Sequence, residues 1–288
     1  MLNLYTINTK SILTPDTLAE GEAASVVYHD LFDYPLNFAD IIKWRVGKGV
    51  AGAVSTKSIK SKNGYFFLEE REGLIYKRIL RKRTSERKVQ IARKASEVLR
   101  LIPTVKMVAL TGSLAMNNST EDGDIDLLIA TRRGTLWTTR LLIYFLLFLA
   151  RFSLRHPEDK VQKDKLCLNM WLDEADFAWP GKDRNIYTAH EIAQIIPFVN
   201  KDGTYEKFLS KNNWILDFWP NSVKLGPVAD GGRRKASAGI IEKLAFKLQY
   251  FYMKRKITRE TVTPTRALFH PQDWGQVVLD RLKTLLVE

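Results

Sequence analysis

Apolar positions show no period over residues 1–20, and from residue 23 they follow a pattern typical of helices. The spacing predicts one helix over residues 23–34, ended by Pro35, and a second over 35–44 with Pro35 in its first turn. The next segment, 47–61, is rich in Gly, Ser and Lys and is interpreted as either a short helix or a loop. A longer helix is predicted over 79–102.

Two short β-type runs at 65–69 and 74–79 are joined by a turn at 70–73, so they predict a hairpin before the long helix. The order helix, helix, weak helix, hairpin resembles that of a winged-helix unit. We therefore expect a leader at residues 1–20 and a winged-helix-like domain with a basic linker helix at 21–102.

Beyond Pro103 the pattern changes to apolar runs of strand length around one apolar helix. The runs at 105–111, 125–131 and 166–172 predict strands, and 136–153 predicts the helix. After Pro180 the spacing again predicts helices, at 189–199, 205–219, 241–252 and 276–287. The sequence thus predicts an α+β fold with its strand-containing core at 103–180 and a C-terminal helical region at 181–288.

The apolar helix contains a ten-residue apolar stretch at 141–150, bracketed by Arg140 and Arg151. A membrane span needs about 20 apolar residues, so we expect a helix buried inside the fold and no membrane partner. The single cysteine, Cys167, excludes an intramolecular disulfide and a Cys-based zinc site. The N-terminus lacks the basic start and apolar run of a secretion signal, and a cytoplasmic location is expected.

Basic residues are concentrated in two windows. Lys and Arg outnumber Asp and Glu by 45 to 32, and the net charge of +13 favours an anionic partner. Residues 71–100 have a net charge of +8 and residues 231–260 one of +7, so the rest of the chain is slightly acidic. Both windows have helical spacing with an apolar and a basic face. Either they bind an anion, or their Lys and Arg stems only cover apolar surface.

The stretch 108–131 carries the residues with the most informative chemistry. One apolar strand ends at Gly112 and Ser113, and another begins at Asp124 and Asp126. A Gly permits a tight turn and close approach of a ligand, so exposed N–H groups at this turn can hold phosphate oxygens. Carboxylates two apart on a strand face the same side, about 7 Å from one another along the strand. Such a pair can bind Mg²⁺ together with water and substrate phosphates, which predicts a nucleoside triphosphate site.

Each part alone also has a purely structural explanation, because Asp-x-Asp occurs in surface strands and Gly-Ser ends many strands as a turn. Their conjunction favours function, since a carboxylate pair beside an apolar strand leaves charge near the core unless something compensates it.

Other candidate residues for a functional site are weaker. The four histidines have no metal-binding spacing, and Trp214, Phe218 and Trp219 are interpreted as core residues.

The stretch resembles the signature of the polymerase-β-type nucleotidyltransferase superfamily, in which apolar-Gly-Ser is followed by Asp-x-Asp among apolar residues. The resemblance in motif covers about 106–173, and the segment YHDLFDYPL at 28–36 is similar to one in a group of bacterial nucleotidyltransferase-domain proteins. The superfamily implies a small mixed sheet with helices on one side. It also implies transfer of a nucleoside monophosphate from a triphosphate, here expected to be ATP, to an acceptor hydroxyl, with release of pyrophosphate.

By motif position the resemblance implies a role for each residue. Gly112 and Ser113 would bind the β- and γ-phosphates, and Asp124 and Asp126 would be catalytic and hold two Mg²⁺ ions, or Mn²⁺ in their place. The superfamily usually adds a third carboxylate from a later strand. The aligned position here is Asn169, which is neutral and cannot act as a base.

Strand alternation puts Cys167, Asn169, Trp171 and Asp173 on one face, so Asp173 is expected as the third catalytic carboxylate. Asp164 has the opposite parity and would need a bulge or a loop position. Lys163 and Lys165 flank the same strand and are expected to neutralise nucleotide phosphates, unless they are solvated surface residues.

Two classes of function follow. The first is an Mg²⁺-dependent nucleotidyltransferase whose winged-helix-like unit and basic helices hold a nucleic acid, RNA such as tRNA rather than DNA. In a variant of it, the acceptor is a small molecule or a protein and the basic helices only steer the triphosphate. The second is a nucleic-acid-binding regulator that keeps the fold as a nucleotide sensor. The three glycines in 47–61 disfavour a recognition helix there. The oligomeric state is left open.

Overall fold

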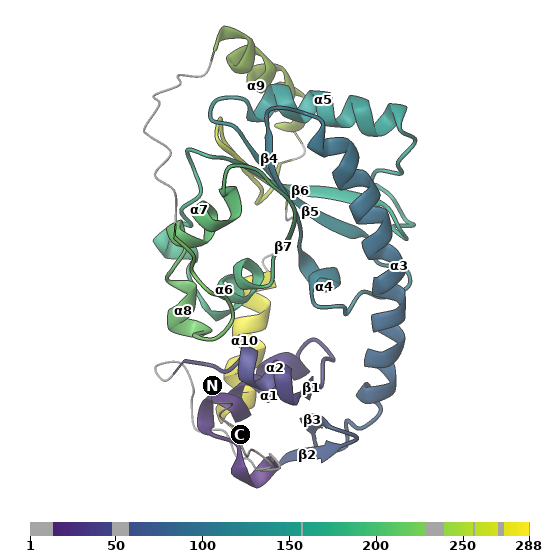
Figure 1. Ribbon diagram of the computed structural model, residues 1–288, viewed down its shortest axis with the longest axis vertical. Coiled ribbons are helices and arrows are strands. Elements are labelled where there is room, and N and C mark those ends of the chain that lie inside the picture. The colour runs from purple at the N-terminus through teal and green to yellow at the C-terminus, as the bar shows by residue number, and fades with distance from the viewer. Residues whose placement is uncertain are drawn as a thin grey trace, which may run out of the picture.

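A computed structural model describes residues 14–47, 58–156, 158–227, 239–255, 257–269 and 274–287, with side chains up to residue 284. The molecule is elongated (Figure 1). A small N-terminal unit lies at one end, a central sheet lies in the middle, and a pair of helices lies at the other end (Figure 1).

The N-terminal unit is built from short elements: a 3-10 turn (Pro15–Thr17), α1 (Glu20–Asp30), β1 (Leu36–Asn37), α2 (Phe38–Lys43), β2 (Ile59–Lys62) and β3 (Tyr65–Leu68). Its strands form an antiparallel sheet in the order β1-β3-β2. Helix α2 begins at Phe38 and not at Pro35, because the Asn37 side chain accepts a hydrogen bond from the Asp40 N–H and caps the helix. Most of the expected third helix, 48–57, and residues 1–13 lie outside the described residues, so the winged-helix unit and the leader stay predictions.

The hairpin lies one segment earlier in the chain than expected. Strands β2 and β3 are joined by Asn63 and Gly64, which have φ values of 51° and 77°. A two-residue hairpin turn requires this left-handed conformation, and Asn-Gly adopts it readily. The predicted second strand at 74–79 is wrong, because these residues form the first turns of helix α3 (Leu74–Arg100). A short apolar run fits either a strand or a helix, and here the helical spacing of the residues that follow decides.

A six-stranded mixed sheet in the order β7-β4-β5-β6-β9-β8 forms the centre of the molecule. Its strands are β4 (Val105–Leu110), β5 (Ile125–Thr131), β6 (Leu166–Asp173), β7 (Ile196–Asn200), β8 (Thr261–Val262) and β9 (Arg266–Leu268). Strands β5 and β6 run parallel, and the other described neighbours in this sheet are antiparallel. The three predicted strands are confirmed to within one residue at their ends, as is the mixed sheet.

The prediction of a helix over 189–199 is wrong in its second half. Helix α6 ends at Ala193, and residues 196–200 form strand β7 at one edge of the sheet. Pro197 cannot continue a helix, and in an edge strand its missing N–H is tolerated. Because β8 and β9 extend the opposite edge, the segment after residue 180 contributes strands as well as the expected helices.

Helices cover both faces of the sheet, whereas the resemblance implied helices on one side. The strand residues Ile125, Leu127 and Ile129 pack against α3, α5 (Leu136–Leu149) and α9 (Ile240–Met253). Leu128 and Ala130 face the other core, which also contains side chains of α1 and of the elements α6 (Ile186–Ala193), α7 (Thr204–Lys211), α8 (Ile215–Phe218) and α10 (Trp274–Val287). A short helix α4 (Gly112–Ala115) and a 3-10 turn (Gly181–Asp183) complete the described elements.

The expectation that residues 141–150 form a fully buried helix is wrong on one side. Ile143 and Leu147 of α5 are buried, but Leu141, Phe145 and Phe148 on its outer side are exposed. Within the described ranges, no helix has the length and apolar character that crossing a membrane would require.

Candidate active site

The turn after β4 approaches the acidic strand closely. The backbone N–H of Thr111 donates to the backbone oxygen of Asp126 at 3.1 Å, and Gly112 then begins α4 with a φ of 62°. A Cβ at Gly112 would lie only 2.6 Å from Oδ2 of Asp126. Glycine is therefore needed both for the backbone conformation and for the space beside the carboxylate. Ser113, the next residue, is exposed.

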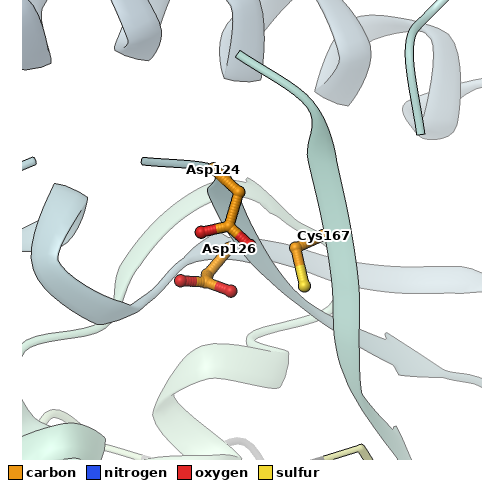
Figure 2. A group of neighbouring side chains, drawn as sticks. All are labelled: Asp124, Asp126 and Cys167. Atoms are coloured by element: carbon orange, nitrogen blue, oxygen red, sulfur yellow. The ribbon is translucent and has the colours of Figure 1, made fainter. Parts of the chain in front are cut away.

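Asp124, Asp126 and Cys167 point toward one another (Figure 2). Asp126 lies opposite Cys167 in the parallel pair β5-β6, and Asp124 directly precedes β5. One ligand atom from each residue lies within 4.8 Å of those of the other two. The aspartates are partly buried and the thiol is buried. The two sequence-predicted aspartates thus share one small site.

Asn169 supplies a further oxygen at this site. Its Nδ2 donates a hydrogen bond to Oδ1 of Asp126 at 2.7 Å. Its own Oδ1 is buried and has no hydrogen-bond partner among the described residues. A buried amide oxygen without a donor is unusual, and this one belongs to a side chain that contacts Asp126. This set of oxygens fits Mg²⁺, which prefers oxygen ligands.

Arg155 is the cation of the site, and it was not predicted from the sequence. Its Nη1 donates to Oδ2 of Asp124 at 2.5 Å and lies 3.5 Å from Sγ of Cys167. The chain before β6 runs along that strand, because Leu154 forms a parallel bridge with Leu166 and Arg155 N–H donates to the Leu166 oxygen. No motif spacing marks Arg155, and only this pairing brings it to the aspartates.

Burial raises the pKa of Asp126 to about 7, and the charge of Asp124 adds to the effect. Glu191 on α6 has a similar environment, since burial and then the charge of Asp126 raise its pKa to about 7. Gln194 donates a hydrogen bond to Oε1 of Glu191 at 2.8 Å. Both carboxyl groups lie in surroundings that penalise negative charge, so a bound cation would favour their ionised forms. Glu191 lies far from the motif in sequence, and no signal there could have found it.

Asp173, the expected third carboxylate, is not brought to the other two. It pairs with Thr131 at the far end of β5, while Asp126 pairs with Cys167. Its carboxylate accepts hydrogen bonds from the N–H groups of Gly134 at 2.6 Å and Ala175 at 2.8 Å. The structure therefore places Asp173 in a loop-stabilising position, away from the aspartate pair.

Asp173 faces away from Asp126 because the alternation of side chains along β6 is broken. The register with β5 shifts between the pairs Asp126–Cys167 and Leu128–Met170. Met170 therefore packs on the same face as Asn169, in the core that contains Leu128, and Trp171 packs in the opposite core. An extra residue at a bulge reverses the parity of everything after it.

The two lysines flanking β6 form ion pairs with acidic residues of the chain. Lys163 lies 2.6 Å from Glu121, and Lys165 lies 2.9 Å from Asp159. Asp164, between them, has a φ of 60° and pairs with Arg87 of α3 at 2.5 Å. The backbone oxygen of Lys165 accepts from the Ile125 N–H between the two aspartates, but the three side chains form ion pairs with other residues than Asp124 and Asp126.

Helix α3 holds the loop that leads to Asp124. The side chain of Lys88 is fully buried, its Nζ donates to the Gly123 oxygen, and it lies 3.7 Å from Oδ1 of Asp164. Ser85 Oγ of the same helix accepts from the Ser119 N–H at 3.1 Å. Cations of α3 such as Lys88 and Arg87 therefore contact other parts of the chain and stabilise the fold.

Residues 91–177 match the nucleotidyltransferase domain family. The matched segment contains the Gly112-Ser113 turn, Asp124 and Asp126, and it is consistent with the polymerase-β-type superfamily that these residues resemble. No curated protein and no solved structure matches the chain. The motif, its geometry and the family match agree: residues 91–177 are a nucleotidyltransferase domain, and the protein is an enzyme that transfers a nucleoside monophosphate.

Proposed function

We propose that the protein transfers a nucleoside monophosphate from a triphosphate, ATP in the first instance, to a hydroxyl group of a cytoplasmic RNA, in a reaction that requires Mg²⁺ or Mn²⁺. The observation that carries the proposal is the convergence of Gly112, Asp124 and Asp126 within the nucleotidyltransferase domain. The orphaned oxygen of Asn169 beside them supports a bound cation.

Asp124, Asp126 and Asn169 Oδ1 would hold the divalent ion. When bound, such an ion lowers the pKa of the attacking hydroxyl and offsets the charge of the triphosphate. In the transfer, the acceptor oxygen forms a bond to the α-phosphorus, the bond from that phosphorus to pyrophosphate breaks, and the hydroxyl proton passes to a base. Asn169 cannot accept it. Glu191, with a pKa of about 7, can accept a proton at neutral pH.

Arg155 and the Gly112-Ser113 turn would bind the triphosphate. A guanidinium group offers paired donors that match phosphate oxygens. Because Arg155 shares Asp124 with the ion, a bound cation would release Arg155 to contact phosphate.

The charge that the fold leaves on its surface supports the proposed acceptor. Several cations of α3 pair within the chain, but Lys82, Arg83 and Lys94 of the same helix are exposed. These side chains support an RNA acceptor, because its phosphates attract a row of basic groups.

The test is incubation of the full chain with each α-labelled NTP, Mg²⁺ and total cellular RNA, beside an Asp124→Asn/Asp126→Asn variant. Asp122→Asn is the matched control, because this exposed carboxylate lies in the same loop. We expect label in the RNA fraction with wild type and control, and none with the double variant. Label in the protein or small-molecule fraction would show that the acceptor belongs to that class and is not RNA. A wild type that labels nothing with any NTP would contradict the proposal.

Asn169 also supports a second candidate, a nucleic-acid-binding regulator that senses nucleotide through a catalytically slow site. Asn169→Asp separates the two, because it restores the third carboxylate beside Asp126. If the wild type transfers nucleotide and Asn169→Asp transfers it faster, the protein is a transferase. Nucleotide binding without wild-type turnover, together with selectivity among DNA sequences in salt-titrated binding, fits the regulator.

A further inference from the structure

Helix α9 exposes a stripe of large apolar side chains and buries two polar ones. Its buried residues are Glu242, Ala245 and Gln249. Five large apolar residues of the same helix are each at least 65 % exposed: Ile240, Ile241, Leu244, Leu248 and Phe251. An amphipathic helix normally buries its apolar stripe against the core, so this orientation requires an explanation.

Polar contacts with α5 fix that orientation. The carboxylate of Glu242 accepts hydrogen bonds from the N–H groups of Trp137 at 2.6 Å and Thr138 at 2.9 Å, where α5 begins. Gln249 donates to the Trp137 oxygen at 2.9 Å and accepts from Arg140 at 2.7 Å. Rotating the apolar stripe of α9 inward would break all of these contacts and leave buried polar groups unpaired.

The outer side of α5, the helix in contact with α9, is also apolar. Leu141, Leu142, Phe145, Phe148 and Leu149 are exposed there. The two helices lie together at the end of the molecule opposite the termini (Figure 1). We call these five residues and the five of α9 the α5–α9 surface. A surface of ten large apolar side chains marks an interaction site.

The charges around the α5–α9 surface are basic. Residues 136–151 contain no acidic residue, and within 240–255 the single acid, Glu242, is buried. Lys243, Lys247 and Lys254 are exposed and follow one another at helical spacing along one flank of the apolar stripe. Lys254 Nζ lies 4.4 Å from the centre of the Phe251 ring. In a two-fold pairing of copies, each would bring the same cations to one interface, which disfavours a second copy as the occupant.

We propose that the α5–α9 surface docks the protein on an anionic lipid surface. Exposed Leu, Ile and Phe side chains would enter the boundary between headgroups and acyl chains, and the flanking lysines would contact lipid phosphates. The sequence-based expectation of no membrane partner depended on burial of residues 141–150, and the exposure of α5 removes that ground. Peripheral docking needs no membrane-spanning helix.

The test is flotation of the full chain with vesicles of phosphatidylglycerol and phosphatidylcholine, and with vesicles of phosphatidylcholine alone. We expect binding to the anionic vesicles, weak binding to the neutral ones, and a loss on the order of tenfold or more in Leu244→Ser/Leu248→Ser/Phe251→Ser. The matched control is Phe38→Ser/Tyr76→Ser, two exposed residues of the N-terminal end. It should bind like the wild type.

A second variant, Lys243→Gln/Lys247→Gln, keeps the apolar stripe and should lose most of the preference for anionic vesicles. Sedimentation equilibrium without lipid accompanies these measurements, with the urea midpoint as a check that each variant is folded. Absence of wild-type flotation, or equal flotation of the folded triple variant, overturns the proposal. A wild-type dimer that the triple variant turns into a monomer also overturns it and makes the surface an interface between copies.

Discussion

The surroundings of Asp126 come from two separate parts of the chain, residues 111–112 and residue 169. Its backbone oxygen binds Thr111, its side chain accepts from Asn169, and its Oδ2 occupies the space that a side chain at position 112 would need. Burial keeps its pKa near 7, so the site attracts a cation that would replace the proton. The position of Asp126 thus decides its pKa and its capacity to bind a cation more than its residue type does.

Gly112→Ala is expected to damage the site more than the fold. A Cβ at φ 62° costs about 1 kcal/mol of stability, and it also collides with Oδ2 of Asp126. Displacing that carboxylate should lower transfer on the order of 100-fold, measured with labelled NTP. The matched control is Gly64→Ala, which has a φ of 77° but nothing within 4 Å of the added Cβ. Equal transfer in both variants would contradict the close approach to Asp126.

At the scale of elements, α3 joins the N-terminal unit to the active-site loops. Near its start, Arg78 pairs with Asp40 and Lys77 with Asp33. Further along, Lys88 is fully buried against the loop that precedes Asp124. The basic window that first indicated an anionic partner therefore has a structural role as well.

Lys88→Met should destabilise the protein by about 3 kcal/mol, because it leaves the Gly123 oxygen and Asp164 without their buried partner. Lys94→Met on the same helix removes an exposed lysine and should change the unfolding free energy by less than about 0.5 kcal/mol. Urea unfolding at neutral pH measures both changes. A Lys88→Met variant as stable as Lys94→Met would refute the buried role of the ammonium group.

At the scale of the whole molecule, α1 and α6 are joined by two buried histidines. His29 Nε2 and His190 Nε2 lie 3.1 Å apart, and His29 Nδ1 lies 2.8 Å from the Ser25 oxygen. The rings of Tyr28, Trp44 and Trp219 surround the pair. Burial lowers the pKa of His29 to about 4, and that of His190 is also lowered by burial and by His29. Both rings are therefore neutral in the folded protein at pH 7.

This contact predicts acid sensitivity. His29 binds a proton below about pH 6.5 in the unfolded chain but only near pH 4 in the folded one. Stability from this group is fully present above pH 6.5 and is lost as the pH falls toward 4, by on the order of 3 kcal/mol. Urea midpoints between pH 7.5 and 5 measure the slope, which should flatten in His29→Gln and persist in His156→Gln, where the imidazole is exposed. An unchanged slope in His29→Gln would assign the acid sensitivity to other groups.

Local signals predicted strand β4, which leads to Gly112, and strand β5, which contains Asp126 and directly follows Asp124, because apolar runs, a glycine turn and a same-face carboxylate pair are all short-range patterns. The local signals failed where the same residues fit two different structures. Residues 74–79 fit a strand or a helix, and the alternation through Cys167 and Asn169 gave no sign of the bulge that turns Asp173 away. Both outcomes depend on what packs against the segment.

The sequence by itself determined the central strands, the Gly112-Ser113 turn and the aspartate pair, since a residue two positions away on a strand must face the same side. Only the tertiary structure decided which other groups reach that pair. Arg155 and Asn169 contact it because strand pairing brings them there, and helix packing places Glu191 where the charge of Asp126 raises its pKa. The outward face of α9 was decided in the same way, because the polar contacts of Glu242 and Gln249 with α5 fix its orientation.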